Sequence, residues 1–117
     1  MNDTDRIARL VVLAGVQRDR DLGALAQAAQ ARAATRVRIE ALRLSTIAPV
    51  PADPVLFGVH QRHRHWAEDQ RRALNHELAR QSADWHDARA RAARSFGRAA
   101  VLDRIARTAR RKATSAD

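Results

Sequence analysis

A stretch of close to sixty residues without an internal proline, from Pro54 to about Lys112, constrains this chain more than any other feature. Asp53 can cap its first free N–H groups, and Pro54 suits the first helical position, where a missing N–H costs nothing. At about 1.5 Å per residue, such a helix is roughly 85–90 Å long and must pack its apolar stripe on another helix. The residues that recur at spacings of three and four, as in a coiled-coil seam, are His63, Trp66, Gln70, Leu74, Leu78, Gln81, Trp85, Ala88, Ala92, Phe96 or Ser95, Ala99, Leu102, Ala106 and Ala109.

The partner helix is predicted over residues 4–48. Asp3 or Thr4 can cap its start, and Pro49 ends it near Ala48, because proline disfavours helical geometry in the residue before it. Its expected seam is Leu22, Ala26, Ala29, Ala33, Val37, Ala41, Leu44 and Ile47. Gly15 and Gly23 weaken this helix, so an alternative breaks it between them and folds a third short helix back.

Residues 49–54 form a short, proline-rich connector, and short helix–helix connections place neighbouring helices antiparallel. The predicted fold class is therefore all-α, an elongated antiparallel two-helix coiled-coil hairpin forming one domain over residues 1–117. Helix one covers about 4–48, helix two covers about 54–112, and a frayed tail covers 113–117. We expect the extra length of helix two to overhang at the end where both termini lie.

The positive charge is concentrated in one segment of helix two. The formal net charge is +9, and residues 88–112 hold nine basic residues against Asp103 alone. The same segment is the expected overhang, so we take it as a candidate partner-binding surface. Its candidate residues are Arg94, Arg98, Arg104, Arg107, Arg110 and Arg111.

The chain shows no pattern typical of catalysis. It has no cysteine and no glycine-rich phosphate loop. Of its five histidines, His60 and His63 share a helix face, but His65 points about 140° away from His60. We therefore expect no enzyme activity, no catalytic residues, no metal and no cofactor. No run of about 18 apolar residues is present, so we expect no membrane insertion. With no cysteine there is no disulfide framework, and we expect a cytoplasmic location.

One segment resembles a known family. The sequence Arg89-Ala-Arg-Ala-Ala-Arg94-Ser-Phe-Gly-Arg98-Ala-Ala-Val-Leu102-Asp-Arg-Ile-Ala-Arg107, on the second arm of a short-looped hairpin, resembles the C-terminal part of the FliJ family. These are small coiled-coil stalk proteins of the flagellar export apparatus, with relatives in virulence-type type III secretion systems. The resemblance implies that one end engages a hexameric export ATPase and the other approaches the membrane export gate. It also implies escort of export chaperones and a place peripheral to the membrane export apparatus.

A gate-facing surface would then lie on the loop-proximal third of both arms. Its candidate residues are Arg36, Ile39, Arg43, His63, Trp66 and Gln70. Trp66 and Trp85 either plug the seam opposite small alanines or leave one indole exposed to anchor a partner. Two other functions remain open: a basic helical nucleic-acid-binding protein, and a generic coiled-coil adaptor, including a toxin–antitoxin-like partner.

Overall fold

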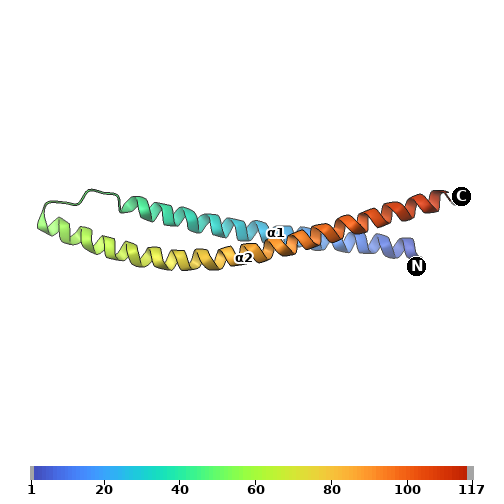
Figure 1. Ribbon diagram of the computed structural model, residues 1–117, viewed down its shortest axis with the longest axis horizontal. Coiled ribbons are helices and arrows are strands. Elements are labelled where there is room, and N and C mark those ends of the chain that lie inside the picture. The colour runs from blue at the N-terminus through green and yellow to red at the C-terminus, as the bar shows by residue number, and fades with distance from the viewer. Residues whose placement is uncertain (1, 116–117) are drawn as a thin grey trace. The chain divides into compact units, whose positions relative to one another are not determined.

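The computed structural model describes residues 2–115, which form two α-helices and no strand. Helix α1 spans Asp3–Ser45 and helix α2 spans Pro54–Ser115, with 43 and 62 residues. The two helices run antiparallel and are joined by residues 46–53 (Figure 1). This arrangement confirms the predicted all-α, antiparallel two-helix hairpin.

The helices contribute to two compact units. The first unit pairs α1 up to Gln27 with α2 from His86 onward, and the second unit contains Ala28–Trp85. Helix α1 runs through Gly15 and Gly23 without interruption, and no glycine has a positive φ angle in the described chain. The alternative with a broken first helix is therefore wrong.

The helix ends show where side chains replace missing backbone partners. The cap of α1 is Asn2 rather than Asp3 or Thr4, because Asn2 Oδ1 accepts the Asp5 N–H at 2.9 Å. Asp53 caps α2 as predicted, and its Oδ1 accepts the N–H groups of Val55 and Leu56 at 2.8 and 3.3 Å. The start of α2 at Pro54 is thus set by the pair of residues that predicted it.

Both C-terminal ends differ from the sequence prediction. Helix α1 stops at Ser45, three residues before Ala48, where the hydroxyls of Ser45 and Thr46 donate to the carbonyls of Leu42 and Arg43 at 2.7 Å each. These hydrogen bonds give partners to two carbonyls in the last turn of α1, so the helix ends before it reaches the residues next to Pro49. Helix α2 continues beyond 112 to Ser115, which donates its hydroxyl to the Arg111 carbonyl at 3.0 Å. Residues 113–115 are therefore helical, and the rest of the expected frayed tail, 116–117, lies outside the described residues.

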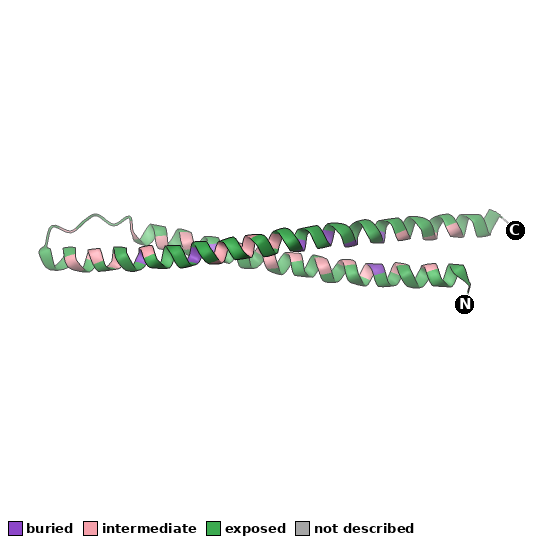
Figure 2. Ribbon diagram, turned by 60° about the horizontal axis from the view of Figure 1, so that its bottom comes forward, coloured by how far each residue is buried: buried purple, intermediate pink, exposed green. Residues whose placement is uncertain are grey.

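The seam of α1 is not the one expected from its apolar residues. Leu22, Val37, Leu44 and Ile47 are all exposed. Of the expected seam only Ala29 is half-buried, and Gly15 is half-buried as well. The other buried and half-buried residues follow an unbroken alternation of four and three, shown as a stripe in Figure 2. They are Ile7, Val11, Ala14, Arg18, Asp21, Leu25, Ala28, Arg32, Thr35, Ile39, Leu42 and Thr46. A continuous helix keeps one phase, so the seam set by Ile7 and Val11 continues through polar positions.

The seam of α2 matches the prediction over most of its length. Leu74, Leu78, Gln81, Trp85, Ala88, Ala92, Ala99, Leu102, Ala106 and Ala109 are buried or half-buried. Of the two candidates offered for one position, Ser95 is buried and Phe96 is exposed. At the loop-proximal end, His63 is half-buried as predicted. The prediction is wrong for Trp66 and Gln70, which are exposed, and Ala67 is the buried residue between them. Of the three seam residues expected in this part of the helix, only His63 is therefore confirmed.

The extra length of α2 lies at the connector, not at the termini. In the first unit, Ile7 and Val11 of α1 line the same hollow as Ala106 and Ala109 of α2, so α1 accompanies α2 almost to its end. In the second unit, the last residue of α1, Ser45, places its Oγ 3.3 Å from Nε2 of His63. Residues 54–62 of α2 therefore extend past α1, and the connector bridges the difference (Figure 1). The basic segment is thus packed along α1 and is not a free overhang.

Candidate partner-binding surfaces

The six arginines predicted for the basic end are all exposed on α2 in the first unit. Two of them have partners within the hairpin. Arg98 donates from Nη1 to Oε1 of Gln17 on α1 at 2.9 Å, and Arg107 pairs with Asp103 at 3.3 Å on its own helix. These two side chains therefore contribute to the surface while being held in place.

The other four arginines spread around the helix. Arg104 precedes the seam residue Ala106 by two positions, and Arg111 follows Ala109 by two, which places both on the face of α2 opposite α1. The side chains of Arg94, Arg104 and Arg111 have no ion pair or hydrogen bond within residues 2–115. The structure thus brings the six together along one segment but on several faces of it.

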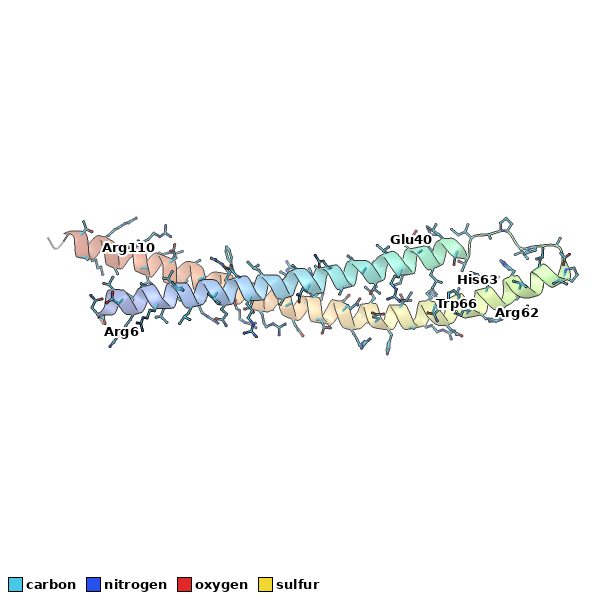
Figure 3. All side chains as sticks on the ribbon, turned by 180° about the vertical axis from the view of Figure 1, so that it is seen from behind. Arg6, Glu40, Arg62, His63, Trp66 and Arg110 are labelled. Atoms are coloured by element: carbon cyan, nitrogen blue, oxygen red, sulfur yellow. The ribbon has the colours of Figure 1, made fainter. Side chains whose placement is uncertain are left out.

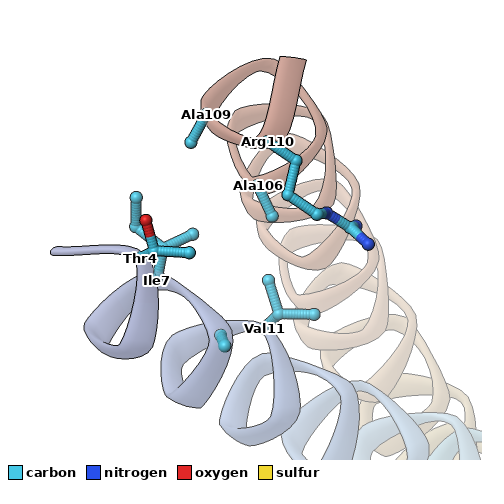
Figure 4. Close-up of a pocket in the computed structure, with 7 residues that line it drawn as sticks. Thr4, Ile7, Val11, Ala106, Ala109 and Arg110 are labelled. Carbon is cyan, nitrogen blue, oxygen red and sulfur yellow. The ribbon is translucent and has the colours of Figure 1, made fainter. Parts of the chain in front are cut away.

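Arg110 lies at the rim of an apolar hollow between the two helices. The hollow is lined by Thr4, Ile7, Ala8, Val11, Ala106, Ala109 and Arg110, and Figure 4 shows Ile7 and Val11 of α1 near the two alanines of α2. Small side chains on α2 leave space opposite the larger apolar residues of α1. Arg110 therefore borders an apolar recess, which its charge alone did not predict.

Charged and polar residues occupy the middle of the helix interface. In the first unit, the Ser95 hydroxyl donates to Oδ2 of Asp21 on α1. In the second unit, Arg32 of α1 stacks over the ring of Trp85, and its Nε is buried without a hydrogen-bond partner, as is Oε1 of Gln81. The sequence prediction missed Asp21 and Arg32 as seam residues, although continuing the four–three spacing from Ile7 would have found them.

The six loop-proximal candidates do not form one surface. A hollow in the second unit is lined by Ile39, Leu42, Arg43, Thr46, Arg64, Ala67, Glu68, Arg71 and Asn75. Only Ile39 and Arg43 of the six candidates line it, and Arg36 is exposed on α1. Trp66 and Gln70 lie two positions to either side of Glu68, about 200° around α2, so they point away from this hollow.

Trp66 is an exposed aromatic residue, not a seam residue. It is 53% exposed, and its ring centroid lies 5.6 Å from that of His63 (Figure 3). Trp85, by contrast, is half-buried in the seam. Of the two alternatives left open for the tryptophans, the structure therefore shows the one in which one indole, that of Trp66, is exposed.

Two ion pairs within single helices, Glu68–Arg71 and Glu40–Arg43, include residues that line the hollow of the second unit. The hydrogen bond from Arg71 holds the pKa of Glu68 below its usual range, and the hydrogen bond from Arg43 does the same for Glu40. Nη2 of Arg43 lies 2.7 Å from Oε1 of Glu40. Glu68, Arg71, Arg64 and Asn75 were not among the predicted partner-binding residues, although the charge spacing around Glu68 is typical of ion pairs on a helix surface.

The described residues contain no group of three or more His, Cys, Asp or Glu that could hold a metal ion. Within the same part of the chain, neither helix is long and apolar enough to cross a membrane. Comparison with known proteins found no matching family model, no matching curated protein and no matching solved structure.

Proposed function

We propose that this chain is a non-enzymatic coiled-coil stalk or adaptor of a flagellar-type, type III protein export apparatus. The observation that carries the proposal is the basic segment of α2, residues 88–112, with nine basic side chains and Asp103 alone. It packs on α1 through Ala88, Ala92, Ser95 and Ala99, and its arginines stay exposed on several faces of α2. The resemblance of residues 89–107 to the FliJ family supports the same function.

In this proposal the basic segment docks on the export ATPase hexamer. Charges on the rim of an interface accelerate encounter and set orientation more than they raise affinity. Arg104 and Arg111 are suited to this role because they face away from α1 and have no partner within residues 2–115. The hollow around Glu68 and the exposed Trp66 of the second unit offer separate surfaces for the membrane export gate and for export chaperones.

The proposal is tested with Arg104→Glu combined with Arg111→Glu. We expect helical content to stay unchanged, association with a purified export ATPase to slow at least about tenfold, and stimulation of ATP hydrolysis to disappear. The matched control is Arg62→Glu with Arg80→Glu, which makes the same change in charge on exposed residues of the second unit. Full stimulation by the first variant contradicts docking through the basic segment.

A nucleic-acid-binding function is the second candidate, favoured by the distribution of arginines over several faces of α2. Such binding rests on phosphate contacts and falls steeply with salt. Tight binding to duplex DNA at physiological salt, together with no binding to the ATPase, would replace the stalk by this function.

A further inference from the structure

The face of α1 that points away from α2 carries exposed apolar residues in the first unit. Val12 and Val16 are 65% and 62% exposed, and Leu13 beside them is equally open. The outer face consists of Asp5, Arg9, Val12, Val16, Asp19 and Gly23. Each of these lies two positions before a seam residue, about 200° around the helix, so the hairpin itself leaves this face uncovered.

The outer face repeats at the four–three spacing of a second coiled-coil seam. A shallow apolar hollow on it is lined by Ala8, Arg9, Val12 and Leu13. Contacts within the hairpin do not explain why valines occupy the centre of the outer face, because Val12 and Val16 point away from α2. A further helix packed on this side would bury them.

Charges on this segment are balanced and ordered. Up to Gln27, α1 has four arginines and four aspartates, whereas residues 86–115 of α2 have nine basic residues and two acidic ones. On the outer face, Arg9 precedes the valines and Asp19 follows them. When a second copy of α1 lies antiparallel to the first, Arg9 of each copy therefore comes opposite Asp19 of the other.

We propose that this face binds the same face of a second copy of the chain, with the two α1 helices antiparallel about a two-fold axis level with Ala14. In this register Val12 of one copy lies opposite Val16 of the other, and Arg9 lies opposite Asp19. The symmetry repeats both contacts, as an isologous interface requires. Asp5 then faces Gly23, whose small size leaves room for the carboxylate.

Charge complementarity selects a second copy over other occupants. An acidic helix or an anionic membrane would be attracted to Arg9 but repelled by Asp5 and Asp19 on the same face. A copy of α1 matches both signs at once. The outer face of α2 offers no comparable self-match, since Arg104 and Arg111 there would face like charges.

Sedimentation equilibrium of the full chain over a hundredfold range of concentration tests the proposal. We expect a reversible dimer, and Val16→Glu should raise its dissociation constant at least about tenfold without loss of helical content by circular dichroism. The matched control is Val37→Glu, an equally exposed valine (68%) on α1 in the second unit, which should leave the dimer unchanged.

Charge reversal tests the predicted register. Arg9→Asp alone should weaken the dimer about tenfold, and Arg9→Asp with Asp19→Arg should restore most of the loss. The sequence has no cysteine, so single cysteines can report orientation. When Val12→Cys and Val16→Cys chains are mixed and oxidised, the mixed disulfide should form in excess over either homodimer.

Three results would overturn the proposal. The first is a monomer at every concentration, including the case in which that monomer binds vesicles of anionic lipid. The second is a dimer that Val16→Glu leaves intact. The third is a different register or direction of packing, shown by a failure of the double charge reversal to restore association or by an excess of Val12→Cys homodimers, which indicates parallel packing. None of these results depends on binding to an export ATPase.

Discussion

The guanidinium carbon of Arg32 lies 4.7 Å from the centroid of the Trp85 ring, across the helix interface of the second unit. Arg32 is half-buried, and its Nε has no hydrogen-bond partner. A cation over an indole face is attracted by the ring quadrupole, but an unpaired buried donor is costly. Polar positions of this kind commonly specify the register of paired helices at some cost in stability.

Replacing Arg32 by leucine should therefore stabilise the hairpin. Arg32→Leu loses a cation–π contact of about 0.5–2 kcal/mol, but it removes an unpaired donor that costs about 1–3 kcal/mol and adds buried apolar area. We expect the free energy of unfolding in urea to rise by about 1 kcal/mol. Arg36→Leu, on an exposed position one turn further along α1, serves as the control and should change it little. A lower unfolding midpoint for Arg32→Leu would show that the contact between Arg32 and Trp85 stabilises the hairpin by more than the unpaired Nε destabilises it.

The close packing of the first unit should not tolerate a larger side chain at Ala92. This residue is buried in the α2 seam, and its neighbour Ala93 is exposed. Ala92→Leu should lower the free energy of unfolding by about 1–3 kcal/mol through overpacking. Ala93→Leu is the matched control and should stay within about 0.5 kcal/mol of the parent. Equal thermal midpoints for the two variants would contradict the seam assignment.

Trp66 should contribute little to stability. More than half of its surface is exposed, so Trp66→Ala is expected to change the free energy of unfolding by less than about 1 kcal/mol. The fluorescence that remains comes from half-buried Trp85 and should move to shorter wavelength. If Trp66→Ala instead lowers the melting temperature sharply, the indole belongs to the core, whereas a loss of partner binding at unchanged melting temperature supports an interface role.

Stability should decline at acidic pH partly through two exposed ion pairs. The pKa of Glu68 is lowered mainly by its hydrogen bond with Arg71, and that of Glu40 mainly by its hydrogen bond with Arg43. A carboxyl whose folded pKa lies below its unfolded value stabilises the fold above the unfolded pKa and loses this effect as pH falls through the folded pKa. The contribution should thus be complete at neutral pH, and it should be lost as pH falls below the ordinary glutamate pKa of about 4.3 and through the lowered folded pKa.

Thermal unfolding of the parent and of Glu40→Gln with Glu68→Gln, followed by circular dichroism between neutral pH and about pH 3, measures this effect. The double variant should be less stable than the parent at neutral pH and nearly equal to it at the acidic end. A constant difference across the range would mean that the two ion pairs do not carry the pH dependence.

The candidate surfaces were only partly predictable from sequence. Exposure of the six arginines between Arg94 and Arg111 followed from their charge, because isolated charges are rarely buried. The apolar recess beside Arg110 and the hollow around Glu68 were not predicted, since each combines residues from both helices. Which α1 residue meets which α2 residue depends on a register that neither helix specifies alone.

Local chemistry in the sequence determined the number and direction of the helices and the start of α2. Asp53 and Pro54 act within one turn, and a short connector leaves two long helices no other way to pack than antiparallel. The sequence left two possible seams on α1, one continuing from Ile7 and one marked by Leu22, and only the tertiary structure decided between them. Leu22, Val37, Leu44 and Ile47 favour one side, but the helix keeps the phase set by Ile7, Val11 and Ala14, and so turns Arg18, Asp21 and Arg32 inward. Long arginine side chains can lie in the seam because their aliphatic stems cover apolar surface. The contacts that α1 makes with α2 along its whole length therefore stabilise the hairpin more than burial of the four apolar residues on the other side would.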